Sequence, residues 1–362
     1  MKVKVKSLSR TVDELSDLGR FAELNDPDRR LIRLSSVIGT YQSNPYLCSG
    51  SQVAQILGVV DDTIIGGVGT MPMRIVADGV GYGVSANPDL LVNEKYRSTG
   101  FALELMESEP ETAYDGIAVN FYVSQSARRV AALLGASVFG IAQFAIVRRS
   151  AHFFAHRLPR RISKLICLVL DVVFAIHRAM LRVVVKARTF GWKCEEVSSK
   201  NGLEDFVSLV AEDSHRFRED VSAVFMKWVM ENDFDGVKLA EKQILRVADK
   251  KGLVGFVMTK ASNKGTRVRV VEWQSAEGRE VDLPWLLLAA AAKAMKGKDA
   301  AVISISKSDT DVCKVLRRLL PRMPEQAATV HVRDGSPLEK HEGWRDQPNW
   351  RIRPIMGDCA FY

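Results

Sequence analysis

The chain has 362 residues, of which 47% are hydrophobic, and a mean hydropathy of −0.03. These values are typical of a globular protein, and the length exceeds what one hydrophobic core usually serves, so we expect two domains. The formal net charge of +8 favours an anionic partner, such as coenzyme A, a nucleic acid or a membrane surface.

The five cysteines are scattered and odd in number, and none forms a Cys-x-x-Cys pair. This pattern argues against a disulfide framework or a zinc knuckle, and it favours a reducing, cytoplasmic compartment. His152 and His156 have metal-ligand spacing on a predicted helix, but no glutamate completes a His-Glu-x-x-His motif. We therefore predict no metal.

The first 150 residues have the pattern of one α/β unit. Lysine and valine alternate at the start of the chain, which predicts a strand and not the apolar core of a signal peptide. Two later apolar runs flank the pair Asp61-Asp62, which is typical of a hairpin turn. The elements predicted up to and including this hairpin are a strand at 3–7, a polar helix at 12–24, and the hairpin strands at 54–60 and 63–68.

An apolar run at 90–92 is followed by a polar loop that contains Arg97 and Gly100. Helical periodicity begins directly after the loop, so a strand is predicted to lead into a helix there. A helix start exposes unpaired backbone N–H groups and the positive end of the helix dipole, which together suit a pyrophosphate. Gly100 would let the backbone approach such a group, and Arg97 would add a charged donor.

The elements after this loop follow in a distinctive order: a helix at 100–107, a strand at 116–123, and a helix at 126–134 closed by Gly135. Together with the Arg-x-x-Gly-x-Ala stretch at 97–102, this order resembles the acyl-CoA loop of the GNAT superfamily of N-acetyltransferases. The resemblance implies an α/β fold with a mixed sheet and acetyl-CoA, or another acyl-CoA, as co-substrate. The alternative is a plain βαβα unit in which Gly100 only caps a turn.

The resemblance also implies which residues touch the acyl-CoA. A backbone N–H near the end of the strand before the loop, at Leu91 or Val92, would polarise the thioester carbonyl. Side chains at the start of the second helix, Ser126 and Arg129, would contact the pantetheine or the adenine phosphate. The loop residues expected on the pyrophosphate are Arg97, Ser98, Thr99, Gly100, Phe101 and Ala102.

The acid–base groups are less well marked. Asp89 lies near the reacting end of the strand and is the candidate general base, while Asn87 and Ser85 share its alternation face and could hold a water. Family members often place a tyrosine four residues before the glycine that closes the second helix, but Ala131 stands there in this chain. Tyr122 is the remaining candidate acid, and the absence of the usual tyrosine leaves open a non-catalytic domain that only binds CoA.

Residues 151–188 form a basic connector that contains the most hydrophobic stretch of the chain, at 165–185. Its charged residues are costly in lipid, and three interpretations stay open: a helix buried between domains, an interfacial membrane helix, and a membrane span. No nucleic-acid motif accompanies the charge, so nucleic acid is not a predicted partner. Peripheral contact of 148–188 with an anionic inner membrane face is predicted as an option.

Residues 189–362 repeat the strand–helix order of the first half, which suggests two tandem GNAT-like domains. The second is predicted to be degenerate, because its equivalent loop at 277–285 has no glycine at the helix start and carries Glu280 and Asp282, which would repel a pyrophosphate. The segment at 348–358 loosely resembles the tryptophan-rich last strand of GNAT-like proteins from bacterial exopolysaccharide clusters.

The function predicted from these patterns is acyl-CoA-dependent N- or O-acyl transfer. The expected reaction is acetyl transfer to an amino sugar, a glycan precursor or another small amine. A related possibility is aminoacylation of a peptidoglycan precursor, although the intact CoA loop argues against a tRNA donor. The alternative from another class is a non-catalytic CoA-binding or scaffold protein, associated with a membrane surface or self-associated as a homo-oligomer.

Overall fold

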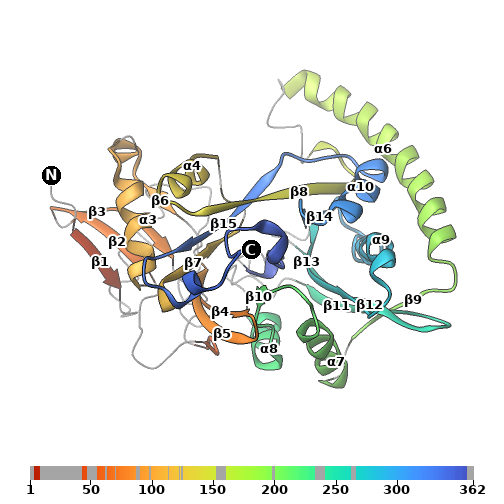
Figure 1. Cartoon of the computed structure of the whole chain (residues 1–362). Coiled ribbons are helices and arrows are strands. Elements are labelled where there is room, and N and C mark those ends of the chain that lie inside the picture. The colour runs from red at the N-terminus through yellow and green to blue at the C-terminus, as the bar shows by residue number, and fades with distance from the viewer. Residues whose placement is uncertain are drawn as a thin grey trace. The chain divides into compact units, whose positions relative to one another are not determined.

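The computed structural model describes residues 4–8, 43–46, 55–61, 63–69, 71–86, 90–97, 99–112, 114–121, 123, 125–151, 160–197, 200–232, 241–261 and 266–356 (Figure 1). The chain divides into two compact units, each assembled from separated stretches of sequence. Unit 1 contains Met1–Ile141, Ser214–Leu239 and Gln326–Tyr362, and unit 2 contains Ala142–Asp213 and Ala240–Glu325.

In unit 1, one set of strands forms a small antiparallel sheet in the order β1-β2-β3-β6. The predicted hairpin is present, with Asp61 in a left-handed turn conformation at φ 47°. The strands of this sheet are β1 (Lys4–Leu8), β2 (Gln55–Val60), β3 (Thr63–Gly69) and β6 (Leu91–Val92).

The remaining strands of unit 1 follow the order β10-β4-β5-β7-β15-β8. Strand β5 is parallel to β7, and β15 is antiparallel to both β7 and β8, so the sheet is mixed. The strands are β4 (Met71–Ala77), β5 (Val80–Ala86), β7 (Ile117–Asn120), β8 (Ser137–Val147), β10 (Phe217–Glu219) and β15 (Gln326–Val332). The boundary between the units falls within β8, after Ile141.

Unit 1 contains three described α-helices: α3 (Phe101–Thr112), α4 (Gln125–Leu133) and α8 (Ala223–Glu231). The first two confirm the helices predicted on either side of the strand now seen as β7. Helix α4 ends where Gly135 adopts φ 79°, and the Ala136 amide donates to the Ala131 carbonyl at 3.0 Å. A left-handed residue closed by such a bond is a common helix terminator, and glycine adopts it without strain.

The C-terminal segment does not form the predicted last strand. Its described part consists of short 3-10 helices at Gln347–Asn349 and Pro354–Met356, joined by irregular chain that makes an isolated bridge between Trp350 and Phe217. The Trp350 ring is buried and stacks on Phe217 with ring centroids 5.0 Å apart. Proline at 348 and at 354 removes backbone donors from the stretch, which explains why it cannot pair as a regular strand.

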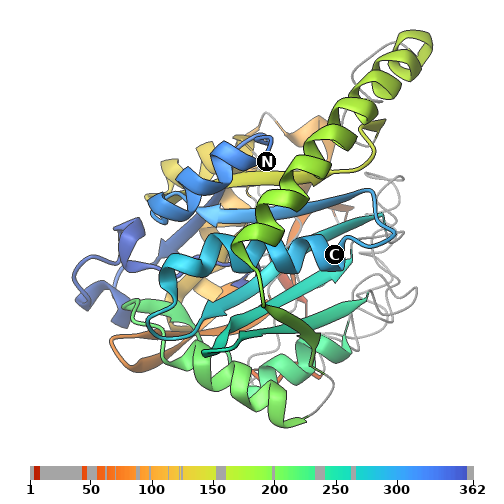
Figure 2. The same ribbon diagram turned by 90° about the vertical axis from the view of Figure 1, so that its right-hand side faces the viewer.

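In unit 2, strands follow the order β8-β14-β13-β12-β11-β9, with β13 and β14 parallel. Helix α9 packs on this sheet through Leu286, Leu287 and other buried side chains, and α6 and α10 lie on the same face of the sheet (Figure 2). The elements are α6 (Arg160–Arg188), β9 (Lys193–Glu196), α7 (Lys200–Ala211), β11 (Lys242–Asp249), β12 (Gly252–Ala261), β13 (Arg267–Ser275), α9 (Leu283–Ala294), β14 (Ala300–Ser306) and α10 (Thr310–Leu319).

Helix α6 forms residues 160–188 of the predicted connector, and one of its faces packs in the core of unit 2 through Leu181 and the partly buried Val185. Its other face is exposed, so its described part does not form the fully buried helix that the apolar sequence allowed. Among the described residues, none of the helices is both long and apolar enough to cross a membrane.

Candidate functional site

The candidate site begins at β5 and β6, which follow one another in the chain. Strand β5 pairs with β7 at Ser85 and Ala86, whereas β6, which follows it in the chain, pairs instead with β3 through Leu91 and Val92. The two consecutive strands therefore belong to different sheets.

The loop after β6 is held by its own backbone and side chains. The Asn93 amide donates to the Ile65 carbonyl at 2.8 Å, and the Asn93 side chain accepts from the Lys95 amide at 3.1 Å, starting a 3-10 turn at Glu94–Tyr96. The exposed Arg97 side chain folds back so that its Nε donates to the Val92 carbonyl at 3.0 Å. The guanidinium is thereby oriented at the end of β6.

Gly100 starts the helix. Its carbonyl accepts from the amides of Leu103 and Glu104 at 2.8 and 3.3 Å, and its φ is 84°, a left-handed conformation that favours glycine. The amides of Phe101 and Ala102 open α3, where N–H groups have no partner within the helix. Such a helix start is a ready anion site, and a Cβ added at Gly100 would meet no atom within 4 Å.

The first residue of helix α3, Phe101, packs the helix start into the core. The Phe101 ring is 1% exposed and packs with Leu105, Val60 and Ile65. Gly58 makes room for it, since a Cβ at that position would lie 1.8 Å from the Phe101 ring. The predicted contribution of Phe101 to ligand binding can therefore come only from its backbone amide.

The second predicted contact region lies on α4. Ser126 and Arg129 are both exposed on this helix. Ala131, which stands where the tyrosine was expected, is 1% exposed and packs with Met106 and Ala136. The side chain at position 131 therefore packs between helices, and it cannot act as the general acid that protonates the thiolate.

Four predicted site residues lie outside the described part of the chain, namely Asn87, Asp89, Ser98 and Tyr122, as do His152 and His156. Of the other predicted residues, Arg97 bonds to the Val92 carbonyl, and the Thr99 hydroxyl donates to the Tyr96 carbonyl at 2.8 Å. Within the described residues, no group of three side chains suited to bind a metal ion occurs.

Sequence reasoning missed a polar cluster at the β4–β5 hairpin. The His341 ring joins the Asp78 carboxylate at 2.7 Å and the Tyr82 hydroxyl at 2.9 Å, and Arg216 donates two hydrogen bonds of 2.8 Å to Asp78. The hydrogen bonds from Arg216, and to a smaller extent the one with His341, hold the pKa of Asp78 well below its usual range. The cluster lies at the start of β5, whereas the predicted catalytic residues Asn87 and Asp89 follow the end of β5 in the sequence.

The loop at 277–285, which the sequence predicts to correspond to the loop around Gly100, is held by ion pairs. Arg279 contacts Asp249 at 2.7 Å and Asp282 at 2.6 Å, and the two carboxylates raise its pKa further. The Glu280 side chain accepts from the Gly278 amide at 3.0 Å. Acidic side chains therefore occupy the Gly278 amide and the Arg279 guanidinium of this loop, which disfavours an anion at this position.

No family model matches the sequence, and no curated protein matches it. Solved structures do resemble the fold. A probable N-acyltransferase of Enterococcus faecalis has a TM-score of 0.54 at 9% identity, over 92% of this chain and 73% of that chain. A GCN5-related N-acetyltransferase of Kribbella flavida has a TM-score of 0.51 at 12% identity, over 91% and 72%.

The N-myristoyltransferase of Saccharomyces cerevisiae, solved with bound myristoyl-CoA, has a TM-score of 0.55 at 10% identity, over 91% of this chain and 82% of that chain. At these identities the likeness concerns the fold. The chain therefore has a mixed α/β fold like that of GCN5-related N-acetyltransferases and N-myristoyltransferase.

Proposed function

We propose that this chain is an acyl-CoA-dependent acyltransferase of the GNAT type. The observation that carries the proposal is that β6, which lies in a different sheet from β5, leads through Arg97 to a helix that starts at a left-handed Gly100. An anion-binding helix start placed directly after a strand edge can hold a pyrophosphate and a thioester at the same time. The fold neighbours include proteins named as acetyl- and N-myristoyltransferases.

Strand alternation selects the donor for the thioester carbonyl. The Asn93 amide bonds to β3, so in an antiparallel pair the Leu91 amide points to the same side and the Val92 amide points away from it. The Val92 carbonyl accepts from Arg97, which agrees with this orientation. Of the two predicted donors, we therefore assign the role to Val92, whose N–H would stabilise the developing oxyanion.

The remaining roles follow the sequence predictions. The amides of Phe101 and Ala102, with Arg97, Ser98 and Thr99, would bind the pyrophosphate of acetyl-CoA or another acyl-CoA. Ser126 and Arg129 would contact its outer parts. Asp89 would act as general base, either directly or through a water held by Asn87, and Tyr122 would protonate the thiolate because Ala131 cannot.

We further propose an amino sugar, a glycan precursor or another small amine or hydroxyl as the acceptor. The support is the sequence resemblance of residues 348–358 to exopolysaccharide-linked relatives. The tandem arrangement, with a degenerate second domain, is supported by the ion-paired loop around Arg279. Domain limits of 1–150, 151–188 and 189–362, a cytoplasmic location and a homo-oligomer stay predictions.

Calorimetry with acetyl-CoA tests the proposal. Gly100→Glu should abolish saturable binding, because it adds a carboxylate and strains the backbone at the pyrophosphate position. Gly79→Glu is the matched control: Gly79 also has a left-handed φ, 85°, and open space around it, but lies in the β4–β5 turn. Equal affinity in wild type and Gly100→Glu, or equal loss in both variants, would contradict the assignment.

A non-catalytic CoA-binding or scaffold protein is the second candidate, and the buried Ala131 favours it. The two candidate functions are distinguished by measuring thiol release from acetyl-CoA in the presence of a panel of amino sugars and small amines. Binding with acceptor-dependent thiol release identifies the transferase. Binding without release by any acceptor would favour the scaffold.

A further inference from the structure

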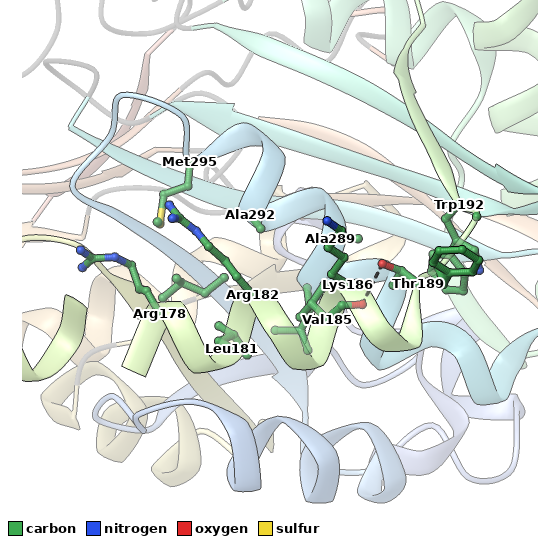
Figure 3. A pocket seen from close by; sticks show the side chains of 14 residues that line it. Arg178, Leu181, Arg182, Val185, Lys186, Thr189, Trp192, Ala289, Ala292 and Met295 are labelled. Atoms are coloured by element: carbon green, nitrogen blue, oxygen red, sulfur yellow. Dashed lines mark hydrogen bonds between the residues drawn. The ribbon is translucent and has the colours of Figure 1, made fainter. Parts of the chain in front are cut away.

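Unit 2 contains an apolar groove that the proposed acyl transfer does not use. It has a volume of about 610 Å³ and lies between α6 and α9, closed at one end by Trp192 (Figure 3). Leu181 and Val185 line it from α6, while Ala289 and Ala292 line it from α9. The small side chains of α9 keep the two helices from filling the space, so the groove can accept a hydrocarbon chain.

A strongly basic cavity of about 510 Å³ adjoins this groove. The two share Arg178, Arg182, Ala292 and Met295, and the cavity adds Arg148, Lys293 and Lys296. No acidic side chain is among the described residues that line it. Five cations around one space repel each other, so an anion bound there would be stabilised by all of them.

The positive charges of the basic cluster lie close enough to affect one another. Arg178 donates to the Val147 carbonyl at 2.6 Å, which holds its guanidinium at the boundary of both cavities. Burial lowers the pKa of Arg178, and the charges of Arg182 and Arg148 lower it further, while Asp171 opposes the shift. A phosphate, with several strong acceptor oxygens, would relieve this repulsion.

The outward face of α6 carries exposed apolar side chains between Leu168 and Val184. Leu168, Ile176, Met180 and Val183 are 63, 59, 66 and 70% exposed, and Phe190 just beyond the helix is 87% exposed. An exposed apolar stripe of this size, bordered by arginine and lysine, is typical of helices that lie in a membrane interface.

We propose that α6 and α9 form a binding site for an anionic phospholipid at a bilayer surface. The phosphate would lie among Arg148, Arg182 and Lys296, one acyl chain would enter the groove beside Leu181, and the exposed face of α6 would lie in the interface. The groove favours a lipid over a free phosphate. The basic cluster disfavours a second copy of the chain, because a two-fold interface on α6 would bring two clusters of like charge together.

Co-sedimentation of the full chain with vesicles tests the site. Vesicles of phosphatidylcholine alone are compared with vesicles that also contain phosphatidylglycerol, and we expect binding only to the second. The double variant Arg182→Glu/Lys296→Glu should weaken this binding roughly tenfold or more, since each basic side chain near an anionic surface contributes to the attraction. Arg318→Glu, on the exposed side of α10, is the matched control and should retain binding.

A second variant tests the groove independently of charge. Ala292 is exposed and lines both cavities, so Ala292→Trp should fill the groove without disturbing the core and weaken binding to the anionic vesicles. Ala211→Trp, at the exposed end of α7, is its control. Unchanged thermal unfolding of all four variants shows that they are folded.

Four results would overturn the proposal. The first is equal binding to both vesicle types or to neither. The second is the same affinity in Ala292→Trp as in wild type, which would mean that no acyl chain enters the groove. The third is equally strong binding of soluble glycerol phosphate, which would assign the cavity to a free phosphate. The fourth is a wild-type dimer in light scattering that Ile176→Asp converts to a monomer, which would assign the face to a second copy.

Discussion

At the scale of single residues, the structure of unit 1 depends on buried polar atoms that find partners far away in the sequence. The Tyr46 hydroxyl donates to the Asp220 carbonyl at 2.6 Å and lies 3.1 Å from the Ser222 hydroxyl, while its ring stacks on Phe225. Burial raises the pKa of Tyr46 to about 12, because the ionised phenolate would be poorly solvated there. The folded state therefore favours the neutral phenol.

This shift predicts a loss of stability at alkaline pH. The folded pKa of Tyr46 lies above the ordinary tyrosine value of 10.0, so its contribution to stability is fully present below pH 10 and is lost as the pH rises toward 12. Tyr46→Phe should cost about 1 kcal/mol of unfolding free energy at neutral pH and reduce the alkaline slope. Urea unfolding of both proteins over a pH series measures this. An unchanged slope in Tyr46→Phe would show that another group titrates.

At the scale of elements, the loop and helix α3 were predictable because their signals are local. A glycine at the turn, periodic apolar residues and flanking polar residues all lie within one short stretch of sequence. The position of α3 over the small sheet was not predictable, because it depends on the fit between Phe101 and Gly58. A glycine within an apolar strand is the signal that could have indicated close approach of another side chain.

Gly58→Ala should therefore displace α3. The added methyl would overlap the Phe101 ring, and overpacking of this kind typically costs about 1–3 kcal/mol. We expect lower unfolding free energy in urea and weaker acetyl-CoA binding in calorimetry, because the helix start moves with the ring. Gly81→Ala is the control, since its methyl would meet only the flexible end of Arg74. Equal effects of the two substitutions would show that Gly58 is not the critical contact.

At the scale of the whole molecule, the two units are interleaved in sequence. Strand β15, near the C-terminus, pairs with both β7 and β8, so the first-half sheet is completed by the last stretch of the chain. Val330 in this strand is fully buried. The order of elements predicted for residues 189–362 suggests a separate domain. The pairing of β15 with β7 and β8, however, places Gln326–Tyr362 within unit 1.

A fragment of residues 1–150 tests this organisation. It contains the whole candidate CoA loop but lacks β15, so β7 and β8 would have unpaired edges and an incomplete core. We expect the fragment to show no cooperative thermal unfolding and no acetyl-CoA binding. A cooperative fragment that binds acetyl-CoA would show instead that the contiguous domain predicted from the sequence folds by itself.

The elements around Arg97 and Gly100 and the fold class could be predicted from the sequence alone, because turn chemistry and periodicity depend on neighbours along the chain. Only the tertiary structure decided which face of α6 packs, where β15 inserts, and that Asp78, Tyr82, Arg216 and His341 form one cluster. These features join residues separated by up to 263 positions. Contacts over such distances depend on how the whole chain folds, which no local pattern contains.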